Sequence, residues 1–562
     1  DLILNGNTTL VANDLGKVGI GTDSPDSLLE IASGTTTDFL KLTSTGSNAS
    51  PSKIIFEKSA TEQGIVEYVR NGDLRIYNTD ADGGVLIDGN SASGSDLYVK
   101  NDGNVGVGTT SPAAKLDVVG RIGLDDGNDN VSIGDAAGDA ITTGVRNVSV
   151  GVSAGTQLST GSDNILIGQS SGSASSAANK NVGIGPYSLQ SLSYSGDSYN
   201  VAVGYHAGRL VTTGLRNTLI GGLAGDALIT GADNTAFGYN ALSSEQAGSR
   251  NTAIGRGALA GLSGAGTAYN TALGYNAGGA STTAQRNTLI GGLSGDAITT
   301  GGDNVTLGYN TLTSNTIGNS NVAIGKDAMM SNVAADRNVA IGLGALQNMT
   351  QATTLDTHNV AVGYAAGINV TSGTFNNFIG GHAGLAVTTG TRNIAIGYDA
   401  LSSEDTGSHN IAIGHAALRD ADAGADAYNV AIGSSAGVSM TTGLRNTLIG
   451  GLSGDALLTG SDNVAVGTNT LSTDDAGGRS VAVGVNALLA QNGGSLHVYN
   501  IGIGYNAGAA ITNATQTTLI GGLAGDAITT GEFNTAVGYN TLSTVTTGGR
   551  NVAMGWSSLR NV

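Results

Sequence analysis

The stretch NTLIGGLAGDALITGADNTAFGYNALSSEQAGSRNTAIG, residues 217–255, decides the fold. Three similar units begin in it, at Asn217, Asn234 and Asn251, and successive starts are 17 residues apart. Each unit opens with Asn, continues with three mostly apolar residues and reaches Gly at the fifth place. Self-similarity at a short fixed period is typical of repeat proteins in which each unit stacks on its neighbours.

The same unit recurs 25 times between Asn130 and Asn551, mostly in steps of 17 residues, with a few of 19, 20 or 21. We number positions within a unit from its opening residue, which is position 0. Gly occupies position 4 in every unit and predicts a corner with positive φ, or a close approach to the next coil. The opening Asn can bond to its own turn and tolerate the left-handed region, and stacked Asn side chains can also bond to one another along the axis.

Positions 1 to 3 predict a short parallel strand, with positions 1 and 3 on one face and position 2 on the other. Positions 1 and 3 are mostly large and apolar, and position 2 is mostly Ala, Gly, Ser or Thr, so both faces are expected to be dry. We expect two short strands and two turns per unit, stacked into a body roughly 120 Å long. In a single chain the position-2 face would stay exposed, and we expect copies of the chain to cover it, three about one axis.

The predicted fold is therefore all-β. Residues 126–562 form a repetitive parallel β-roll, or solenoid, of 25 coils of about 17 residues, assembled as a homotrimeric fibre. Residues 1–125 lack this period and form a small N-terminal β-rich junction domain, with antiparallel strands at SKIIFEK and DLRIYN. The chain stops shortly after Asn551, inside a unit, so we expect the native protein to continue.

The residue before each unit start alternates in charge. It is Arg216, Asp233 and Arg250 in three successive units, and a similar series returns about every four units. In a roll these side chains lie above one another, and such a column fixes the register of the coils. We therefore expect a structural ladder in this part of the chain, formed by Asn200, Asn217, Asn234 and Asn251 together with Arg216, Asp233 and Arg250.

Two known families share these motifs. The units NVAIG at Asn321 and Asn338 and NTAIG at Asn251 resemble the Asn-Ser-Val-Ala-Ile-Gly head repeats of trimeric autotransporter adhesins. That resemblance implies a trimeric left-handed parallel β-roll that binds host surfaces. The present units are longer, however, and no stalk, neck or anchor barrel is visible. The phrases VGIGTDSP at Val18 and VGVGTTSP at Val105 resemble those of bacteriophage tail fibres, which implies a virion protein.

Composition excludes several functions. A formal net charge of -19 and the lack of a dense Lys/Arg cluster argue against nucleic-acid binding. Cysteine is absent, and no apolar run is long enough to span a membrane. The six His lack metal-site spacing, and the repeated Asp at position 9 are interpreted as turn residues. These Asp are Asp139, Asp226, Asp296, Asp455 and Asp526. The calcium-binding nonapeptide of other rolls is missing. We predict no catalytic residue, no metal, no cofactor and no enzyme activity.

Tyrosines at position 5 are the candidate ligand-contacting residues. They are Tyr205, Tyr239, Tyr275, Tyr309, Tyr364, Tyr398, Tyr505 and Tyr539. Many alternate with units that carry Gly at the same position, so one interpretation is that each ring covers the gap left by a neighbouring Gly. The other is an aromatic ladder, spaced about 9.6 Å, that stacks on the sugar rings of a surface polysaccharide.

The sequence favours an extracellular adhesive fibre, a phage tail fibre that contacts a host-surface glycan or protein. A bacterial trimeric surface adhesin head and an inert extracellular filament are the alternatives. The phage fibre is favoured because both ends of the chain look like parts of such a fibre and nothing in it looks like an autotransporter stalk.

Overall fold

The computed structural model describes residues 128–560, except 265, 495 and 496, and ten short segments nearer the N-terminus. These segments are residues 10–12, 18–20, 29–31, 52–58, 61–68, 74–77, 85–87, 97–100, 104–107 and 111–118. The chain divides into two compact units, Asp1–Gly123 and Leu124–Val562. Every regular element in the described residues is a β-strand, which confirms the predicted all-β class.

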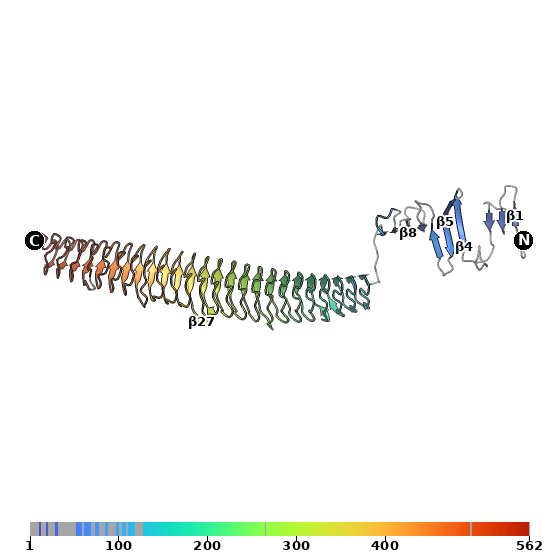
Figure 1. Ribbon diagram of the computed structural model, residues 1–562, viewed down its shortest axis with the longest axis horizontal. Coiled ribbons are helices and arrows are strands. Elements are labelled where there is room, and N and C mark those ends of the chain that lie inside the picture. Colours follow the sequence, from blue (N-terminus) through green and yellow to red (C-terminus); the bar gives the residue numbers. More distant parts are fainter. Residues whose placement is uncertain are drawn as a thin grey trace. The chain divides into compact units, whose positions relative to one another are not determined.

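Three small sheets lie in the first unit (Figure 1). They are formed by β1 (Leu10–Ala12), β2 (Val18–Ile20) and β3 (Leu29–Ile31), by β4 (Ser52–Lys58), β5 (Thr61–Tyr68) and β6 (Leu74–Tyr77), and by β7 (Val85–Ile87), β8 (Leu97–Val99), β9 (Val105–Val107) and β10 (Leu116–Val118). The β4–β5–β6 sheet is antiparallel, as its alternating sequence predicts. Both VGxG phrases begin a parallel pair, β2 with β3 and β9 with β10, so the two near-copies in sequence fold alike.

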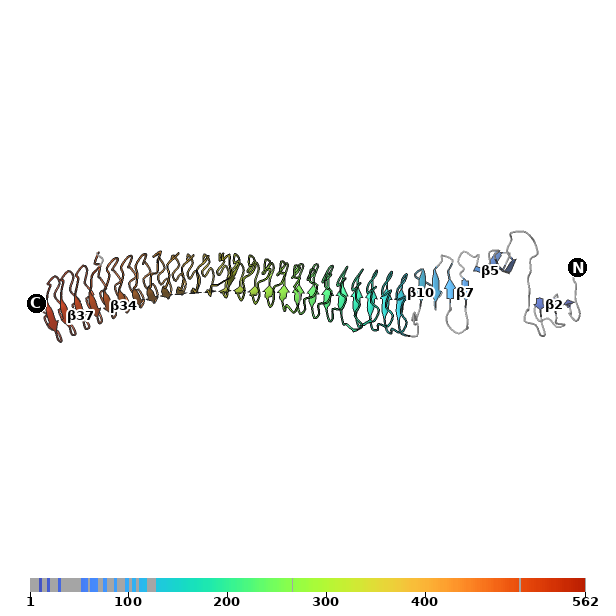
Figure 2. The same ribbon diagram turned by 90° about the horizontal axis from the view of Figure 1, so that it is seen from below.

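The second unit is a parallel β-solenoid with one 25-stranded sheet along its length (Figures 1 and 2). Each strand has three residues, positions 1 to 3 of its unit, and pairs in register with the strands before and after it. The strands are β11 (Val131–Ile133), β12 (Val148–Val150), β13 (Ile165–Ile167), β15 (Val182–Ile184), β17 (Val201–Val203), β18 (Thr218–Ile220), β19 (Thr235–Phe237), β20 (Thr252–Ile254), β21 (Thr271–Leu273), β22 (Thr288–Ile290), β23 (Val305–Leu307), β24 (Val322–Ile324), β26 (Val339–Ile341), β28 (Val360–Val362), β29 (Asn377–Ile379), β30 (Ile394–Ile396), β31 (Ile411–Ile413), β32 (Val430–Ile432), β33 (Thr447–Ile449), β34 (Val464–Val466), β35 (Val481–Val483), β36 (Ile501–Ile503), β37 (Thr518–Ile520), β38 (Thr535–Val537) and β39 (Val552–Met554).

Two short strands per unit were expected, and this is wrong for most units. The rest of each coil consists of turns, joined from one rung to the next by backbone hydrogen bonds such as Thr212 N–H to the Ile229 carbonyl, 2.9 Å. Within the described part of the solenoid, a second strand pair forms only beside two of the longer units, as β14 (Ala178–Asn179) with β16 (Gly196–Asp197) and as β25 (Ala335–Asp336) with β27 (Leu355–Asp356). The 17-residue coil is too short for a second regular strand, because its remaining length is used by corners.

The interior of the coil lies on the side opposite to the one expected. Position 2 points inward and is buried, as Ala202, Leu219 and Ala236 show with no exposed surface. Positions 1 and 3 point outward, and Phe237 and Leu307 at position 3 are 52% and 47% exposed. The expectation that the position-2 face needs a partner is therefore wrong. Small residues occupy position 2 because the coil encloses little space, and the large apolar residues face outward.

Adjacent rungs fill this narrow interior in complementary ways. In one rung Leu219 at position 2 lies over Gly225 at position 8, where an added Cβ would lie 2.8 Å from Leu219 Cδ2. In the next rung the sizes are exchanged, with Ala236 at position 2 and Leu242 at position 8. All three of these side chains are fully buried, and Gly225 and Leu242 share a φ of 55°. Position 8 therefore accepts Leu in the left-handed region when position 2 is small.

This exchange gives a first prediction. Leu219→Ala leaves a cavity and is expected to destabilise the stack locally by about 2–5 kcal/mol. Gly225→Leu alone overpacks the same rung, by about 1–3 kcal/mol. The double variant reproduces the arrangement of Ala236 with Leu242 and is expected to recover most of the loss. Hydrogen exchange of amides 217–234 measures the local stability of each variant. A double variant less stable than either single variant would contradict complementary packing.

Candidate functional site

The asparagine ladder runs inside the solenoid along its whole length. Asn217 donates from its backbone N–H and from Nδ2 to Asn200 Oδ1, at 3.0 and 3.1 Å, and also from Nδ2 to the Gly231 carbonyl of its own unit. Asn234 and Asn251 repeat the bonds to the preceding Asn. These side chains are buried, so an opening Asn such as Asn217 satisfies backbone groups at its own corner and also joins its rung to the neighbouring ones. The left-handed residue is the one before Asn, as in Arg216 with a φ of 54°.

One unit opens with Ser instead of Asn, and a Gln restores the ladder there. Gln491 Nε2 donates to Ser480 Oγ at 3.0 Å, and Asn500 Nδ2 donates to Gln491 Oε1 at 2.9 Å. Gln491 also donates to the carboxylate of Asp474 at 2.5 Å. Sequence reasoning missed this role of Gln491. The signal was present, because a buried apolar residue stands at the same position of most other units.

Arg216, Asp233 and Arg250 lie above one another in the column before the unit starts. Arg216 binds Asp233 through two bonds, Nε to Oδ1 at 2.6 Å and Nη2 to Oδ2 at 3.1 Å, and Arg250 Nε lies 4.0 Å from Asp233 Oδ2. The hydrogen bond from Arg216 holds the pKa of Asp233 below its ordinary value. These side chains are between one third and about half exposed, so solvent screens the pairs and the column contributes register and little stability.

Aromatic residues continue this column wherever a longer unit interrupts it. Lys180 Nζ lies 5.1 Å from the centroid of the Tyr199 ring, and Arg250 lies 5.4 Å from that of Tyr269. Arg479 lies 5.5 Å from the ring of Tyr499 in the same way. A cation over an aromatic face is attracted to it. The inserted loops therefore break the sequence of charges without breaking the stack.

The tyrosines of position 5 are about half exposed along one corner. Their exposed fractions lie between 49% for Tyr275 and 58% for Tyr505. Four of them lie over the Gly of the preceding rung; at Gly222, for example, an added Cβ would lie 3.4 Å from Tyr239 Cδ2. The same arrangement holds for Tyr309, Tyr398 and Tyr539. Covering a Gly accounts for one face of each of these rings and leaves half of the side chain open.

One part of this corner carries a run of four rings from four successive rungs. Tyr364, His382, Tyr398 and His415 follow one another with centroid distances of 5.2, 5.5 and 5.9 Å. We call these residues the ring strip. His382 Nδ1 lies 3.1 Å from Asp399 Oδ1, which fixes the orientation of that imidazole. The position-5 pattern identified the two tyrosines. It did not reveal His382, which stands at position 6, and it passed over His415, which stands at position 5 but was not counted among the tyrosines.

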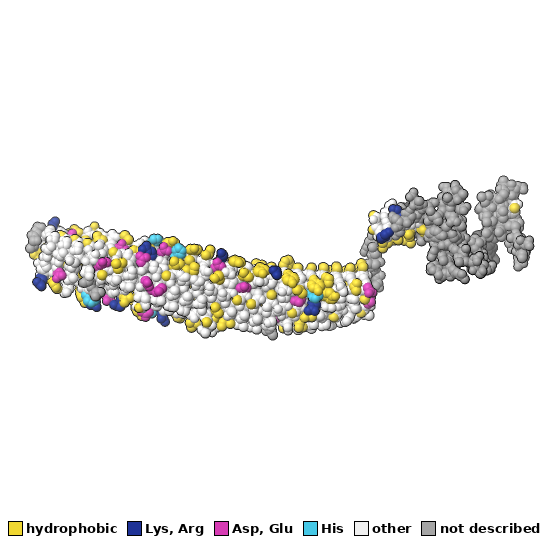
Figure 3. Space-filling model, in the orientation of Figure 1, with side chains coloured by type: hydrophobic (Ala, Val, Ile, Leu, Met, Phe, Trp, Pro, Cys, Tyr) yellow, Lys and Arg dark blue, Asp and Glu magenta, His cyan; other side chains and the backbone are white. Residues whose placement is uncertain are grey.

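A long apolar face is formed by positions 1 and 3 of the 25 strands. None of these residues is charged, and all are apolar or Thr except Asn377. Figure 3 shows part of this face as a row of hydrophobic side chains along one edge of the solenoid. Its largest exposed members include Phe237, Leu273, Leu307 and Ile379. We call it the strand face.

Three buried carboxyl groups replace apolar residues at position 11. Glu245 accepts from the Gly248 N–H at 2.6 Å, Glu404 from Gly407 at 2.7 Å and Asp474 from Gly477 at 2.8 Å. Burial raises the pKa of all three carboxyl groups, and these backbone bonds oppose the shift. Each carboxyl group therefore satisfies a backbone N–H at a corner of the coil, and its burial disfavours the charged form.

Glu404 also lies close to two exposed acids, Asp405 and Asp422. The three side chains offer oxygen atoms within 4.8 Å of one another. Burial and the neighbouring Asp405 raise the pKa of Asp422. Oxygen ligands of this kind suit Ca²⁺, but Glu404 already accepts bonds from the N–H groups of Gly407 and Ala423. The sequence could not indicate this cluster, because its members belong to two units of unequal length.

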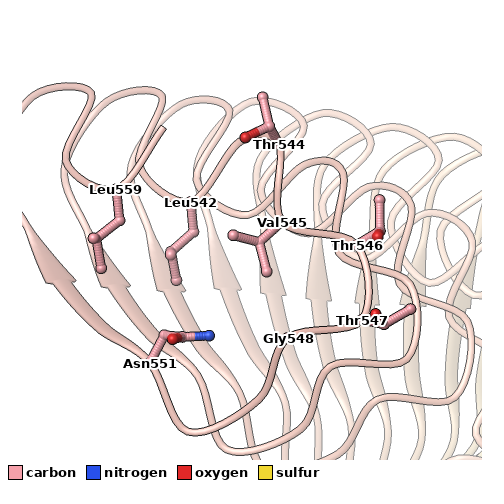
Figure 4. A pocket seen from close by; sticks show the side chains of 8 residues that line it. All are labelled: Leu542, Thr544, Val545, Thr546, Thr547, Gly548, Asn551 and Leu559. Atoms are coloured by element: carbon pink, nitrogen blue, oxygen red, sulfur yellow. The ribbon is translucent and has the colours of Figure 1, made fainter. Parts of the chain in front are cut away.

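A pocket of about 240 Å³ lies at the last rungs of the solenoid (Figure 4). It is lined by Leu542, Thr544, Val545, Thr546, Thr547, Gly548, Asn551 and Leu559. In earlier rungs the equivalent residues are covered by the next coil, so the pocket is the open cross-section of the interior and has no separate site chemistry.

The chain matches no known family model, and no similar curated protein was found. Within the described residues, no helix has the length and apolar character needed to cross a bilayer. The fold and the chemistry of its surfaces are therefore the basis of any assignment.

Proposed function

We propose that this chain is a structural, adhesive fibre protein, a phage tail fibre that contacts the surface of its host cell. The observation that carries the proposal is the separation of two surfaces on one elongated body. The strand face is continuous and mostly apolar, and the tyrosines of position 5 lie on the corner that follows it, beyond the glycine of position 4. One surface suits self-association, and the other suits a ligand. The proposal includes no enzymatic role, no cofactor and no nucleic-acid partner.

The size of the strand face supports self-association. With strands about 4.8 Å apart and three residues about 3.3 Å long each, it measures roughly 120 by 10 Å, or about 1,200 Å². The largest apolar patch on a typical monomer is about 300–600 Å², and a stable interface buries about 800 Å² per partner. A homotrimer, in which each chain presents this face towards a common axis, would cover it. The site of contact is then positions 1 and 3, in place of position 2.

Adhesion is tested with the purified 562-residue chain, labelled with a fluorophore, on a panel of bacterial strains and on surface polysaccharide extracted from them. We expect saturable binding to some strains that an excess of unlabelled chain displaces, because a fibre that carries host attachment must discriminate between surfaces. Absence of saturable binding on every strain would overturn adhesion and favour an inert filament.

A further inference from the structure

We propose that the ring strip, Tyr364, His382, Tyr398 and His415 with Asp399, is a binding site for a neutral pyranose polysaccharide. The inference rests on the proposed adhesive function and names the ligand class of one segment of its surface. It assigns binding to four successive rungs, in place of all eight tyrosines of position 5.

The first argument is the contiguity of exposed ring surface. Tyr364 and Tyr398 are 57% and 52% exposed, and His382 lies between them at ring distances of 5.2 and 5.5 Å. Leu343, in the preceding rung at position 5, extends the strip and is 49% exposed. A contiguous apolar patch with a polar rim on a soluble protein marks an interaction site. The apolar C–H face of a sugar ring matches an aromatic face, and a row of rings along the axis matches an extended chain of sugars.

The second argument is the polar groups at the edge of the rings. Asp399 Oδ1 lies beside His382 Nδ1, so the opposite edge of that imidazole, with Nε2, is turned away from the carboxylate. A carboxylate and an imidazole supply the acceptors and donors that sugar hydroxyl groups need. Precise placement of a few such groups around an apolar surface is what gives small-molecule sites their specificity.

Charge favours a neutral polysaccharide over an acidic one. The chain has a formal net charge of -19, and the strip itself includes Asp399. The nearby cation Arg419, in the rung of His415, is already paired with Asp420 through two bonds of 2.8 and 2.7 Å. An acidic polymer would therefore meet net repulsion and find this guanidinium occupied.

The other ring groups are built differently. Near the N-terminal end of the solenoid the imidazole of His206 stacks on Tyr205, its neighbour in the same rung, at 3.9 Å, and Tyr205 remains 54% exposed. Tyr275 and Tyr309 flank a Gly, as Tyr364 and Tyr398 do, and are 49% and 55% exposed, but no imidazole lies between them. Tyr275 and Tyr309 therefore provide a control pair with matched exposure.

The test compares the unaltered 562-residue chain with Tyr364→Ala/Tyr398→Ala by isothermal titration calorimetry. The probes are soluble dextran, mannan, cello-oligosaccharides and chito-oligosaccharides as neutral polymers, and hyaluronan as an acidic one. We expect at least one neutral probe to bind, with affinity at least tenfold lower in this double variant. Tyr364→Phe/Tyr398→Phe keeps both rings and should retain binding within about threefold. Tyr275→Ala/Tyr309→Ala should leave affinity unchanged.

Three results would overturn the inference. They are absence of binding to every neutral probe, equal loss in the control pair, and a preference for hyaluronan. The cell-binding measurement separates the two proposals. Saturable adhesion that survives Tyr364→Ala/Tyr398→Ala removes the ring strip as the site and leaves the adhesive fibre standing, whereas absence of adhesion by the unaltered chain removes both. Far-ultraviolet circular dichroism confirms that each variant keeps its sheet.

Discussion

Gly221→Ala is expected to disrupt the stack severely, whereas Gly222→Ala, one residue later, is expected to leave it almost unchanged. Gly221 stands at position 4 with a φ of +131°, a region that side-chain-bearing residues rarely adopt. A Cβ there would lie 2.5 Å from the Gly238 carbonyl oxygen and 2.6 Å from its carbon, which are backbone atoms of the next rung. These atoms cannot move without separating two rungs that are joined around the whole coil.

The expected loss for Gly221→Ala is at least about 3 kcal/mol, because strain at φ and a steric clash with backbone add together. Thermal unfolding followed by circular dichroism and hydrogen exchange of amides 218–240 measure it. Gly222 is the control, since its φ is not in the left-handed region and an added Cβ would make an ordinary contact of 3.4 Å with the ring of Tyr239. Equal effects of the two substitutions would show that the rungs can separate at little cost.

The period and its corner glycine could be predicted from the sequence because both act through the backbone. Every coil repeats the same conformation, so a position that needs positive φ or has no room for a Cβ recurs at a fixed interval. The stacking of Arg216 on Asp233 follows from the same reasoning, since residues one period apart are neighbours. These expectations need only the count of residues between equivalent positions.

The inside of the coil could not be predicted in this way. Alternation along the strand places positions 1 and 3 on the face opposite position 2. Because the residues on both faces are mostly apolar, the alternation alone does not show which face points into the coil. The inner face is identified by the combined side-chain volume at positions 2 and 8 of each rung. Leu219 with Gly225 in one rung and Ala236 with Leu242 in the next fill the same narrow space. Pairing position 2 with position 8 in the sequence would have revealed which face is enclosed.

The ring strip and the acidic cluster were missed for another reason. His382 and Glu404 join groups from different rungs whose positions in the unit differ, so no fixed interval connects them. Unequal unit lengths add to this, because Asp422 lies in one of the longer units. A functional surface is expected where individual units deviate from the repeat. An interpretation based on the repeat considers only what the units share, so it does not detect these deviations.

Charges placed on the strand face are expected to convert the fibre to single chains. Phe237, Leu273 and Leu307 stand at position 3 of alternate rungs and are 52%, 45% and 47% exposed in one chain. If copies pack on this face, Phe237→Glu/Leu273→Glu/Leu307→Glu buries three unpaired carboxylates at each interface. Leaving a buried charge without a partner costs about 3–5 kcal/mol for each charge. We expect the association constant to fall by at least about 10⁵-fold, since every 1.4 kcal/mol is tenfold.

Sedimentation velocity at micromolar concentration measures the change, from an assembly of three chains to a single chain of 55.4 kDa. Val152→Glu/Leu343→Glu/Val485→Glu is the control, because these residues are 50%, 49% and 44% exposed but lie at position 5, beyond the corner glycine that ends each strand. This control adds the same charge to the chain and is expected to leave the assembly intact. A single chain before any substitution would contradict self-association, and dissociation by the control alone would place the interface on the tyrosine corner. Since the three strand-face residues are already exposed in one chain, their substitution should not alter its fold, so loss of assembly would report the contact between copies.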